Sequence, residues 1–390
     1  MKHLTERTGN NFSQQITRRK FVQNAAFTVA GIVALKSKIF ASVVGNAGLK
    51  EVFKNDFYVG TAIGSGTFLR NDTKMLDLIA REFSAITPEN ALKWGPVNPA
   101  EKEWRFQVPD MFVDFGMKNN MYIQGHVLVW HSQVPHNLFV DDSGKQVSKE
   151  VLLKRMGNHI STLVDRYKGR INGWDVVNES ITPEGYRKSK WFEIIGPEFM
   201  ERAFHLAHEA DPKARLLYND YNMDNPKRRA FVVDLVNQYK KKGVPITGIG
   251  MQGHVGLDYP DLKEFEASIE AFAATGMRVH ITELDVDVLP KTGTKTSEVS
   301  TNVEYQKSLN PYVDGLPAEV EDKLTHRYEA LFKLFLKHRD KIDRVTFWGT
   351  SDDESWKNNF PVRGRINYPL LFDRNHEPKK AYFAVTALKS

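Results

Sequence analysis

Eight short apolar runs, separated by segments of helical periodicity, constrain the fold of this 390-residue chain more than any other feature. Each run has about the length of a buried strand, and apolar side chains recur every three or four positions in between. Eight strands alternating with helices predict an α/β fold, a (β/α)8 TIM barrel. The predicted strands are Tyr58–Ile63, Ala85–Thr87, Tyr122–Trp130, Gly173–Asn178, Arg215–Tyr218, Gly248–Gln252, Arg278–Thr282 and Arg344–Trp348.

Proline and glycine mark the ends of several predicted helices. Pro226 is expected near a helix start, where its missing N–H costs nothing. Gly243 and Gly276 are expected just past helix ends, where a left-handed backbone is favoured. The clearest helical patterns run from Leu152 to Tyr167, from Phe231 to Tyr239, from Phe265 to Phe272 and from His326 to Leu336.

The alternative architecture is an open, doubly wound sheet. Such a sheet normally carries a glycine-rich phosphate-binding fingerprint after its first strand, and Gly60-x-x-x-Gly64-x-Gly66 does not match one. No linker, repeat or shift in composition divides the chain after residue 50, so residues 48–390 are expected to form one catalytic domain. The one long irregular segment, Leu289 to Pro317, is expected to form a wall of the active-site cleft.

The net charge of +6 lies in the first 47 residues. These carry seven Lys and Arg residues and one Glu, which leaves 47 basic and 47 acidic residues in the rest of the chain. A nucleic-acid-binding domain would concentrate positive charge in its body, so no nucleic-acid partner is expected. The chain has no cysteine, which excludes disulfides and thiolate metal sites.

Residues 1–47 have the features of a twin-arginine signal peptide. Thr17-Arg18-Arg19-Lys20-Phe21 precedes an apolar stretch, Ala25 to Leu35, that is too short to span a membrane. Small residues at Gly45-Asn46-Ala47 offer a cleavage site. The sequence therefore predicts export by the twin-arginine route, with a mature protein that begins near residue 48, is periplasmic or secreted, and has no membrane span.

The predicted strands end in polar and aromatic residues to an unusual degree. A single polar residue there could simply cap the following helix, but the bias recurs at strand after strand. Barrel enzymes place their active sites at this face, so the pattern indicates a catalytic site. The residues concerned are Glu89, Asn90, Lys93, His126, Trp130, His131, Asn178, Glu179, Asn219, Asp220, Tyr221, Gln252, His254, Glu283, Asp285, Trp348 and Trp356.

Three chemistries could use such a ring of residues. Glycoside hydrolysis needs two carboxyl groups, and Glu179 and Glu283 each stand at the end of an apolar strand. Metal-assisted hydrolysis could use the histidines, but no His-x-His or His-Glu-x-x-His spacing occurs. Sugar binding without turnover would need the aromatic residues but not two glutamates.

Six motifs, in order and at workable spacing, resemble those of the glycoside hydrolase family 10 endo-β-1,4-xylanases. The resemblance covers about residues 50–388. A different glycanase, such as a cellulase, is the nearest alternative. The motifs are Thr87-Pro88-Glu89-Asn90-x-x-Lys93-Trp94, Gly125-His126-x-Leu128-x-Trp130-His131, Trp174-Asp175-Val176-Val177-Asn178-Glu179, Gly250-Met251-Gln252-x-His254, Ile281-Thr282-Glu283-Leu284-Asp285 and Trp348-Gly349-x-x-Asp352-x-x-Ser355-Trp356.

The resemblance implies a retaining double displacement, with Glu179 as general acid/base and Glu283 as nucleophile. Their carboxyl groups should then lie about 5–5.5 Å apart. The pKa of Glu179 should be raised, while Glu283 should stay ionised. His254 is the expected hydrogen-bond partner of Glu283, with Asp285 orienting it from behind.

The family also implies which residues contact xylan or xylo-oligosaccharides around the cleaved bond. Asn178 should bind the 2-hydroxyl of the sugar being cleaved. His126, Lys93 and Gln252 should bind sugars on the side that does not leave. Trp130 is expected among the substrate contacts.

Further implied contacts lie along the cleft. Glu89 and Asn90 should hold the next sugar out, and Tyr221 should form a platform on the leaving-group side. Trp348 should stack near the cleaved sugar. Trp356 should occupy the space that a hexose hydroxymethyl group needs, and so favour xylose over glucose. The resemblance implies no cofactor, no metal and no obligate protein partner.

Other prominent residues have structural interpretations. His280 lies in mid-strand and is expected to pack inside the barrel. Asp175 is expected to serve hydrogen bonding inside the barrel mouth, and Asn219 and Asp220 to shape a loop. The tryptophans expected in the core or at helix contacts are Trp94, Trp104, Trp174 and Trp191.

Overall fold

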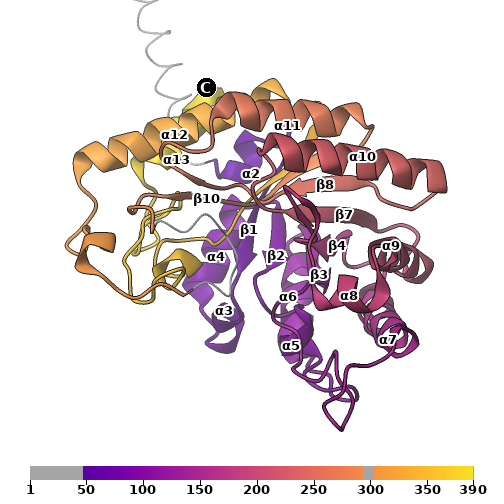
Figure 1. Ribbon diagram of the computed structural model, residues 1–390. Helices are drawn as coiled ribbons and strands as arrows, with labels where there is room; N and C mark the ends of the chain where they lie inside the picture. The colour runs from indigo at the N-terminus through magenta and orange to yellow at the C-terminus, as the bar shows by residue number, and fades with distance from the viewer. Residues whose placement is uncertain (1–46, 293–301, 390) are drawn as a thin grey trace, which may run out of the picture. The chain divides into compact units, whose positions relative to one another are not determined.

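The computed structural model describes residues 47–292 and 302–389. The predicted signal peptide therefore falls outside the described residues, except for Ala47. All eight predicted strands are present, and Figure 1 shows them in the middle of the fold with helices around them. They are β1 (Tyr58–Ile63), β2 (Ala85–Pro88), β3 (Tyr122–Val129), β4 (Gly173–Asn178), β7 (Arg215–Asp220), β8 (Gly248–Met251), β10 (Arg278–Asp287) and β11 (Ile342–Phe347).

These eight strands close into a ring. Every pairing around the ring is parallel, and β11 closes it by pairing with both β1 and β10. The register includes Tyr58 opposite Arg344 and Val279 opposite Ile342. Closure confirms the predicted (β/α)8 barrel and excludes the doubly wound sheet, since every strand delivers its carboxyl end to one face. Short strands β9 (His254–Gly256), β5 (Ile181–Thr182) and β6 (Gly185–Tyr186) lie outside the ring.

Helices surround the barrel and bury one apolar stripe each. On α7, the residues Leu152, Met156, Ile160 and Leu163 are fully buried, as their helical spacing predicts. Each such side chain stabilises the fold by roughly 1.5–3 kcal/mol. The longer helices are α4 (Thr73–Glu82), α6 (Gln107–Lys118), α7 (Lys149–Tyr167), α9 (Glu198–Ala210), α10 (Pro226–Lys242), α11 (Leu262–Ala274) and α12 (Ala318–Lys337); the shorter ones are α2 (Leu49–Val52), α3 (Ser65–Leu69), α5 (Trp94–Val97), α8 (Lys190–Ile195) and α13 (Lys380–Thr386).

The ends of α10 follow the predicted rules. Pro226 is its first residue, and the side chain of Asn225 caps it by accepting hydrogen bonds from the N–H groups of Lys227 and Arg228. Gly243 follows the last turn at φ 72°, a left-handed backbone that suits glycine. These local signals begin and end the helix that leads from β7 to β8.

Two strands, β7 and β10, continue at least two residues further toward the carboxyl face than predicted. β10 continues to Asp287 because Asp285 to Asp287 pair with β9. β7 continues to Asp220, because Asn219 and Asp220 pair with β8. Glu283 therefore lies inside a strand rather than just after one, and its N–H donates to the carbonyl of Gln252.

Within the described residues, no helix is both long enough and apolar enough to cross a membrane.

Candidate active site

A cavity of about 480 Å³ opens at the carboxyl end of the barrel. Residues distant in sequence meet in this cavity. It is lined by side chains from β3, β4, β9 and β10 and from the segments after β2, β3, β4, β8 and β11. Two of them are the carboxylates of Glu179 and Glu283. The lining residues are Glu89, Asn90, Lys93, His126, Trp130, Ser132, Gln133, Asn178, Glu179, Gln252, His254, Glu283, Trp348, Trp356, Asn359 and Phe360.

Glu179 follows β4 directly and is almost wholly buried, with 4% of its surface exposed. Its Oε1 accepts a hydrogen bond of 2.9 Å from the side-chain amide of Gln252, and its Oε2 accepts one of 2.8 Å from the indole of Trp130. Its backbone has φ 54°, in the left-handed region. Both carboxylate oxygens are thus held in a defined orientation.

Glu283 is held by different partners. Its Oε1 accepts a hydrogen bond of 2.7 Å from the amide of Asn219, and its Oε2 lies 3.1 Å from Nε2 of His254. The other ring nitrogen of His254 lies 2.9 Å from Asp285 Oδ2, which also accepts a hydrogen bond of 2.8 Å from the indole of Trp356. His254 therefore lies between two carboxylates.

The surroundings shift the pKa values of the two glutamates in opposite directions. Burial raises the pKa of Glu179, and the negative charges of Asp220 and Glu283 add to the rise. Burial alone would raise the pKa of Glu283 too, but the hydrogen bond and positive charge of His254 hold it below its usual range. One buried carboxyl therefore favours its protonated form and the other its ionised form.

His254 carries a positive charge at neutral pH because two neighbouring carboxylates raise its pKa more than burial lowers it. Burial by itself would lower the pKa of His254, but Asp285 and Glu283 raise it to about 9. The pKa of Asp285 is lowered, because the charges of His254 and Lys357 outweigh its own burial. At neutral pH the three groups form an anion–cation–anion row.

Two further residues link the segments that carry the glutamates. Asn219 accepts a hydrogen bond of 2.9 Å from the N–H of Glu179 through its carbonyl, while its side chain donates to Glu283. Gln252 accepts a bond of 2.6 Å from the N–H of Glu283 through its carbonyl, while its side chain donates to Glu179. Each residue thus fixes one glutamate by its backbone and the other by its side chain.

A chain of buried polar groups inside the barrel orients His126. Arg344 donates to Gln124 Oε1 over 3.0 Å, and Gln124 donates to Asp175 Oδ1 over 2.8 Å. The second oxygen of Asp175 lies 2.9 Å from Nδ1 of His126. The expected role of Asp175 in internal hydrogen bonding is confirmed. His126 lines the cavity, with its ring against the edge of Trp348.

One wall of the cavity consists of Glu89, Asn90, Lys93 and Trp130. The ammonium group of Lys93 donates to Asn90 over 3.0 Å and lies 5.0 Å from the centre of the Trp130 ring. Burial lowers the pKa of Lys93 and raises that of Glu89. This wall offers both charged and aromatic groups to a polar ligand.

Asn178 and Tyr221 differ in their relation to the cavity. Asn178 lines it, and its side-chain oxygen accepts a hydrogen bond of 2.9 Å from Asn219. Tyr221 is not among the lining residues; it is buried, and its hydroxyl is bonded by Arg187. The platform predicted for Tyr221 is therefore not part of this cavity.

Sequence reasoning undervalued Asn219 and Asp220. Both were expected to shape a loop, but both are buried in β7, and Asn219 contacts Glu283 directly. The loop interpretation is wrong because the strand continues two residues further than predicted. The polar ending of that strand, which also singled out Asn178, was the available signal. Four further residues that line the cavity belong to none of the positions predicted from the sequence: Ser132, Gln133, Asn359 and Phe360.

The expectation that residues 289–317 form a wall of the cleft is not met by the described part of that segment. None of its described residues lines the cavity. Val303 donates a backbone hydrogen bond to the carbonyl of Pro361, and the side-chain oxygen of Asn310 accepts a hydrogen bond from the N–H of Ile366. The segment supports the chain that follows β11, and that chain supplies the wall through Trp356, Asn359 and Phe360. Residues 293–301 lie outside the described part of the chain.

The structural interpretations of the remaining residues agree with the structure. His280 is buried inside the barrel, with 2% exposed. Trp94 stacks on His159 with ring centres 3.7 Å apart, and Trp104 lies parallel to the same ring. Trp174 and Trp191 are among the largest fully buried side chains.

In the described part of the chain, one group of side chains could hold a metal ion by geometry. It consists of Glu266 and Glu270 on α11 with His338 at the end of α12. Glu266 already pairs with His338 and Lys337. This group lies on the outer helices rather than in the cavity.

Comparison with known proteins gives a consistent result. Residues 48–388 match the family model described as glycosyl hydrolase family 10. The chain is 45% identical to endo-1,4-beta-xylanase A of Xylanibacter ruminicola, an alignment that covers 85% of this chain and 90% of that protein. It is 41% identical to an endo-1,4-beta-xylanase of Geobacillus stearothermophilus, with 86% and 97% covered.

Solved structures are similar as well. A GH10 endoxylanase retrieved from a sugarcane soil metagenome is 53% identical and superimposes with a TM-score of 0.85, covering 87% of this chain and all of that one. Xylanase XynB of Paenibacillus barcinonensis, solved with a conduramine derivative, is 36% identical with a TM-score of 0.79, covering 87% of this chain and 98% of that one.

Proposed function

The chain belongs to glycosyl hydrolase family 10 and is an endo-1,4-β-xylanase, and we propose that it cleaves xylan with retention of anomeric configuration, using Glu179 as general acid/base and Glu283 as nucleophile. One observation supports this assignment above others. Two buried carboxyls line one cavity, and their neighbours shift their pKa values in opposite directions. A retaining glycosidase needs one protonated and one ionised carboxyl at the same bond.

In the first step, Glu283 attacks the anomeric carbon while Glu179 gives its proton to the glycosidic oxygen. The bond from the anomeric carbon to the leaving oxygen breaks, and an ester bond to Glu283 forms. Asn219 and His254 keep Glu283 ionised and aimed through the contacts described above. The leaving sugar departs as a neutral alcohol.

In the second step, water takes the place of the departed sugar. Glu179, now ionised, removes a proton from the water as its oxygen attacks the anomeric carbon and the ester breaks. Esterification removes the negative charge of Glu283, one of the charges that raise the pKa of Glu179. The pKa of Glu179 therefore falls after esterification, which favours the ionised form that acts as the base in this step.

The cavity walls suit a polar chain of sugars. Asn178 is proposed to bind the 2-hydroxyl of the cleaved sugar, with His126, Lys93 and Gln252 on the non-leaving side. Further contacts are proposed for Glu89, Asn90, Trp130, Trp348 and Trp356. No metal or cofactor is required, because Glu179 carries out both proton transfers and Glu283 supplies the nucleophile.

The assignment is tested by removing each carboxyl in turn. Glu179→Ala and Glu283→Ala should each abolish xylan hydrolysis, while thermal unfolding of both variants stays cooperative. With an activated aryl xylobioside, azide should restore turnover of the Glu179→Ala variant alone, because azide replaces water at an ester that no longer has its base. Full xylanase activity in either variant would refute the assignment.

We also propose that residues 1–47 direct export by the twin-arginine route, on the evidence of Arg18-Arg19 followed by the apolar stretch to Leu35. Replacement of both arginines by lysine should retain the protein inside a bacterial host that exports the original chain. N-terminal sequencing of the exported protein should begin near residue 48. Export of an uncut chain, or export that survives the replacement, would contradict the proposal.

A further inference from the structure

The backbone at Glu179 is in a conformation that residues other than glycine adopt only in a few per cent of cases. Its φ of 54° lies in the left-handed region, where the side chain of an L-residue crowds its own carbonyl. Such a conformation persists only where surrounding contacts impose it, and these tend to gather at functional sites. The conformation of Glu179 therefore depends on the groups that hold the chain on either side of it.

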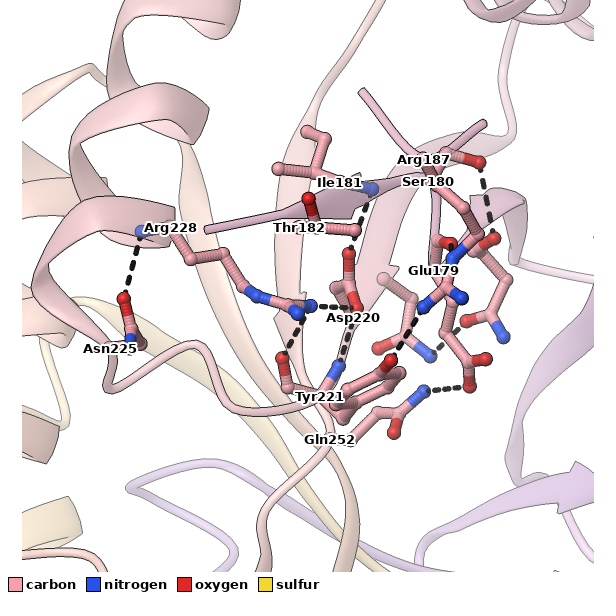
Figure 2. A network of polar contacts seen from close by, with 12 residues as sticks. Glu179, Ser180, Ile181, Thr182, Arg187, Asp220, Tyr221, Asn225, Arg228 and Gln252 are labelled. Atoms are coloured by element: carbon pink, nitrogen blue, oxygen red, sulfur yellow. Dashed lines mark hydrogen bonds and ion pairs between the residues drawn. The ribbon is translucent and has the colours of Figure 1, made fainter. Parts of the chain in front are cut away.

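Asp220 is bound to the chain that follows Glu179, and Figure 2 shows its bond to Ile181. Its Oδ2 accepts a hydrogen bond of 3.4 Å from the N–H of Ile181, and the hydroxyl of Tyr218 also donates to that oxygen. The same hydroxyl accepts a hydrogen bond of 3.2 Å from the N–H of Ser180. The two peptide groups that follow Glu179 are thus both tied, directly or through one hydroxyl, to one carboxylate oxygen.

The other oxygen of Asp220 is anchored in the opposite direction. Oδ1 accepts a hydrogen bond of 2.9 Å from the N–H of Tyr221 and lies 2.6 Å from the guanidinium of Arg228, in the first turn of α10. The side chain of Asp220 is fully buried, and that of Arg228 is 3% exposed. Arg228 also donates to the carbonyl of Tyr221 over 3.0 Å. The carboxylate is therefore fixed to the rigid start of a helix.

We propose that Asp220 is a positioning residue for Glu179: held by Arg228, it binds the chain just after Glu179 and keeps that glutamate in the left-handed conformation that directs its carboxyl into the cavity. The proposal rests on the assignment of Glu179 as the general acid/base. Asp220 touches no substrate in this scheme. A general acid works only within hydrogen-bond reach of the leaving oxygen, so a small rotation of this backbone costs proton transfer.

The negative charge of Asp220 also supports the role of Glu179 as an acid, because it raises the pKa of Glu179. It is the largest charge contribution that raises the pKa of Glu179. Other charged and titratable groups also face Glu179: Glu283 from β10, His131 after β3, Lys93 after β2 and Tyr221 after β7. Arg187 donates a hydrogen bond of 2.7 Å to the backbone carbonyl of Glu179. Removal of the charge of Asp220 should therefore lower the pKa of Glu179.

The test exploits substrates that differ in their need for an acid. An aryl xylobioside with a poor leaving group requires protonation of the leaving oxygen, whereas a dinitrophenyl xylobioside does not. In Asp220→Asn, the side-chain NH2 group faces another hydrogen-bond donor in either orientation of the amide. In one orientation the donors are Tyr221 and Arg228, and in the other the donor is Ile181. We expect kcat/KM to fall about 10- to 100-fold on the poor leaving group and by less than about threefold on the good one. The basic limb of the pH profile should move to lower pH.

A matched control separates this effect from simple destabilisation. Asp352 and Lys379 form another buried pair, with Nζ 2.9 Å from Oδ2, and neither contacts Glu179. Asp352→Asn also leaves a buried cation unpaired. Its effect on the two substrates should be equal, and the basic limb of its pH profile should not move. The comparison isolates what is specific to Asp220.

A second variant covers the case in which Asp220→Asn fails to fold. Tyr218→Phe keeps the Asp220–Arg228 pair and removes only the hydroxyl that joins Ser180 to Asp220. It should show the same preference for the good leaving group, with a loss of about three- to tenfold on the poor one. The proposal is refuted if a variant that folds loses activity equally on both substrates and the basic limb of its pH profile stays where it is in the original enzyme.

The same substrates distinguish this proposal from the function on which it rests. Glu179→Ala should lose far more activity on the poor leaving group than on the good one. If it does not, the acid/base assignment itself fails. If Glu179→Ala shows that preference and the Asp220 and Tyr218 variants do not, only the positioning role is refuted.

Discussion

The side-chain amide of Asn219 lies 2.7 Å from Oε1 of Glu283 and donates a hydrogen bond to it. The oxygen of the same amide accepts a hydrogen bond of 2.5 Å from Thr282, which fixes its orientation. Asn219 is fully buried, so this bond to a carboxylate has no competition from solvent. A hydrogen bond of this kind favours the ionised form of Glu283.

We predict that Asn219→Ala lowers kcat/KM on xylan by about tenfold or more, the equivalent of one hydrogen bond to a charged group. Loss of the bond raises the pKa of Glu283, so the acidic limb of the pH profile should move to higher pH. Asn367→Ala is a suitable control, because Asn367 is equally buried but bonds Asp287 instead. An unmoved acidic limb would show that Asn219 does not tune Glu283.

The unmodified enzyme should show a bell-shaped dependence of kcat/KM on pH. Activity requires ionised Glu283, whose pKa is lowered, and protonated Glu179, whose pKa is raised. Activity is therefore lost as pH falls through the pKa of Glu283 and as pH rises through that of Glu179. In Glu179→Ala, assayed with a dinitrophenyl xylobioside, the basic limb should disappear; its persistence would assign that limb to another group.

Asp285→Asn tests the row of charges behind Glu283. Without Asp285 the pKa of His254 falls from about 9, and His254 loses its positive charge at a lower pH. Asp285 also orients the ring of His254, so its loss weakens the hydrogen bond from His254 to Glu283, which raises the pKa of Glu283 and moves the acidic limb to higher pH. Asp287→Asn, two residues along the same strand, should leave the limb in place, since Asp287 does not contact His254. Similar shifts in both variants would contradict this explanation.

Trp356 should control discrimination between xylose and glucose units. It lines the cavity, stacks on Phe360 with ring centres 4.7 Å apart, and donates to Asp285. Trp356→Ala should raise hydrolysis of carboxymethylcellulose relative to xylan, because the space for a hydroxymethyl group opens. Trp356→Phe loses the N–H donor but keeps most of the bulk, so it should retain the preference for xylan. If both variants discriminate like the original enzyme, the ring does not set specificity.

The sequence alone was sufficient for the barrel and for placing Glu179 and Glu283 in one cavity. Strand and helix patterns are local, so the eight apolar runs indicated the eight strands, and Pro226 and Gly243 indicated the two ends of α10. Closure of the ring then follows from the parallel alternation of strands and helices. Glu179 and Glu283 could be selected because each ends a strand pattern, and parallel strands bring such ends to one face.

What holds and tunes these glutamates was decided by the tertiary structure. Asn219 and Glu283 lie 64 positions apart, and Gln252 and Glu179 lie 73 apart. Nothing in the local sequence states which side chains will meet across the barrel. The pKa of a carboxyl depends on its burial and on the charges around it. Two residues of the same type therefore have pKa values shifted in opposite directions because the closed sheet gives them different neighbours.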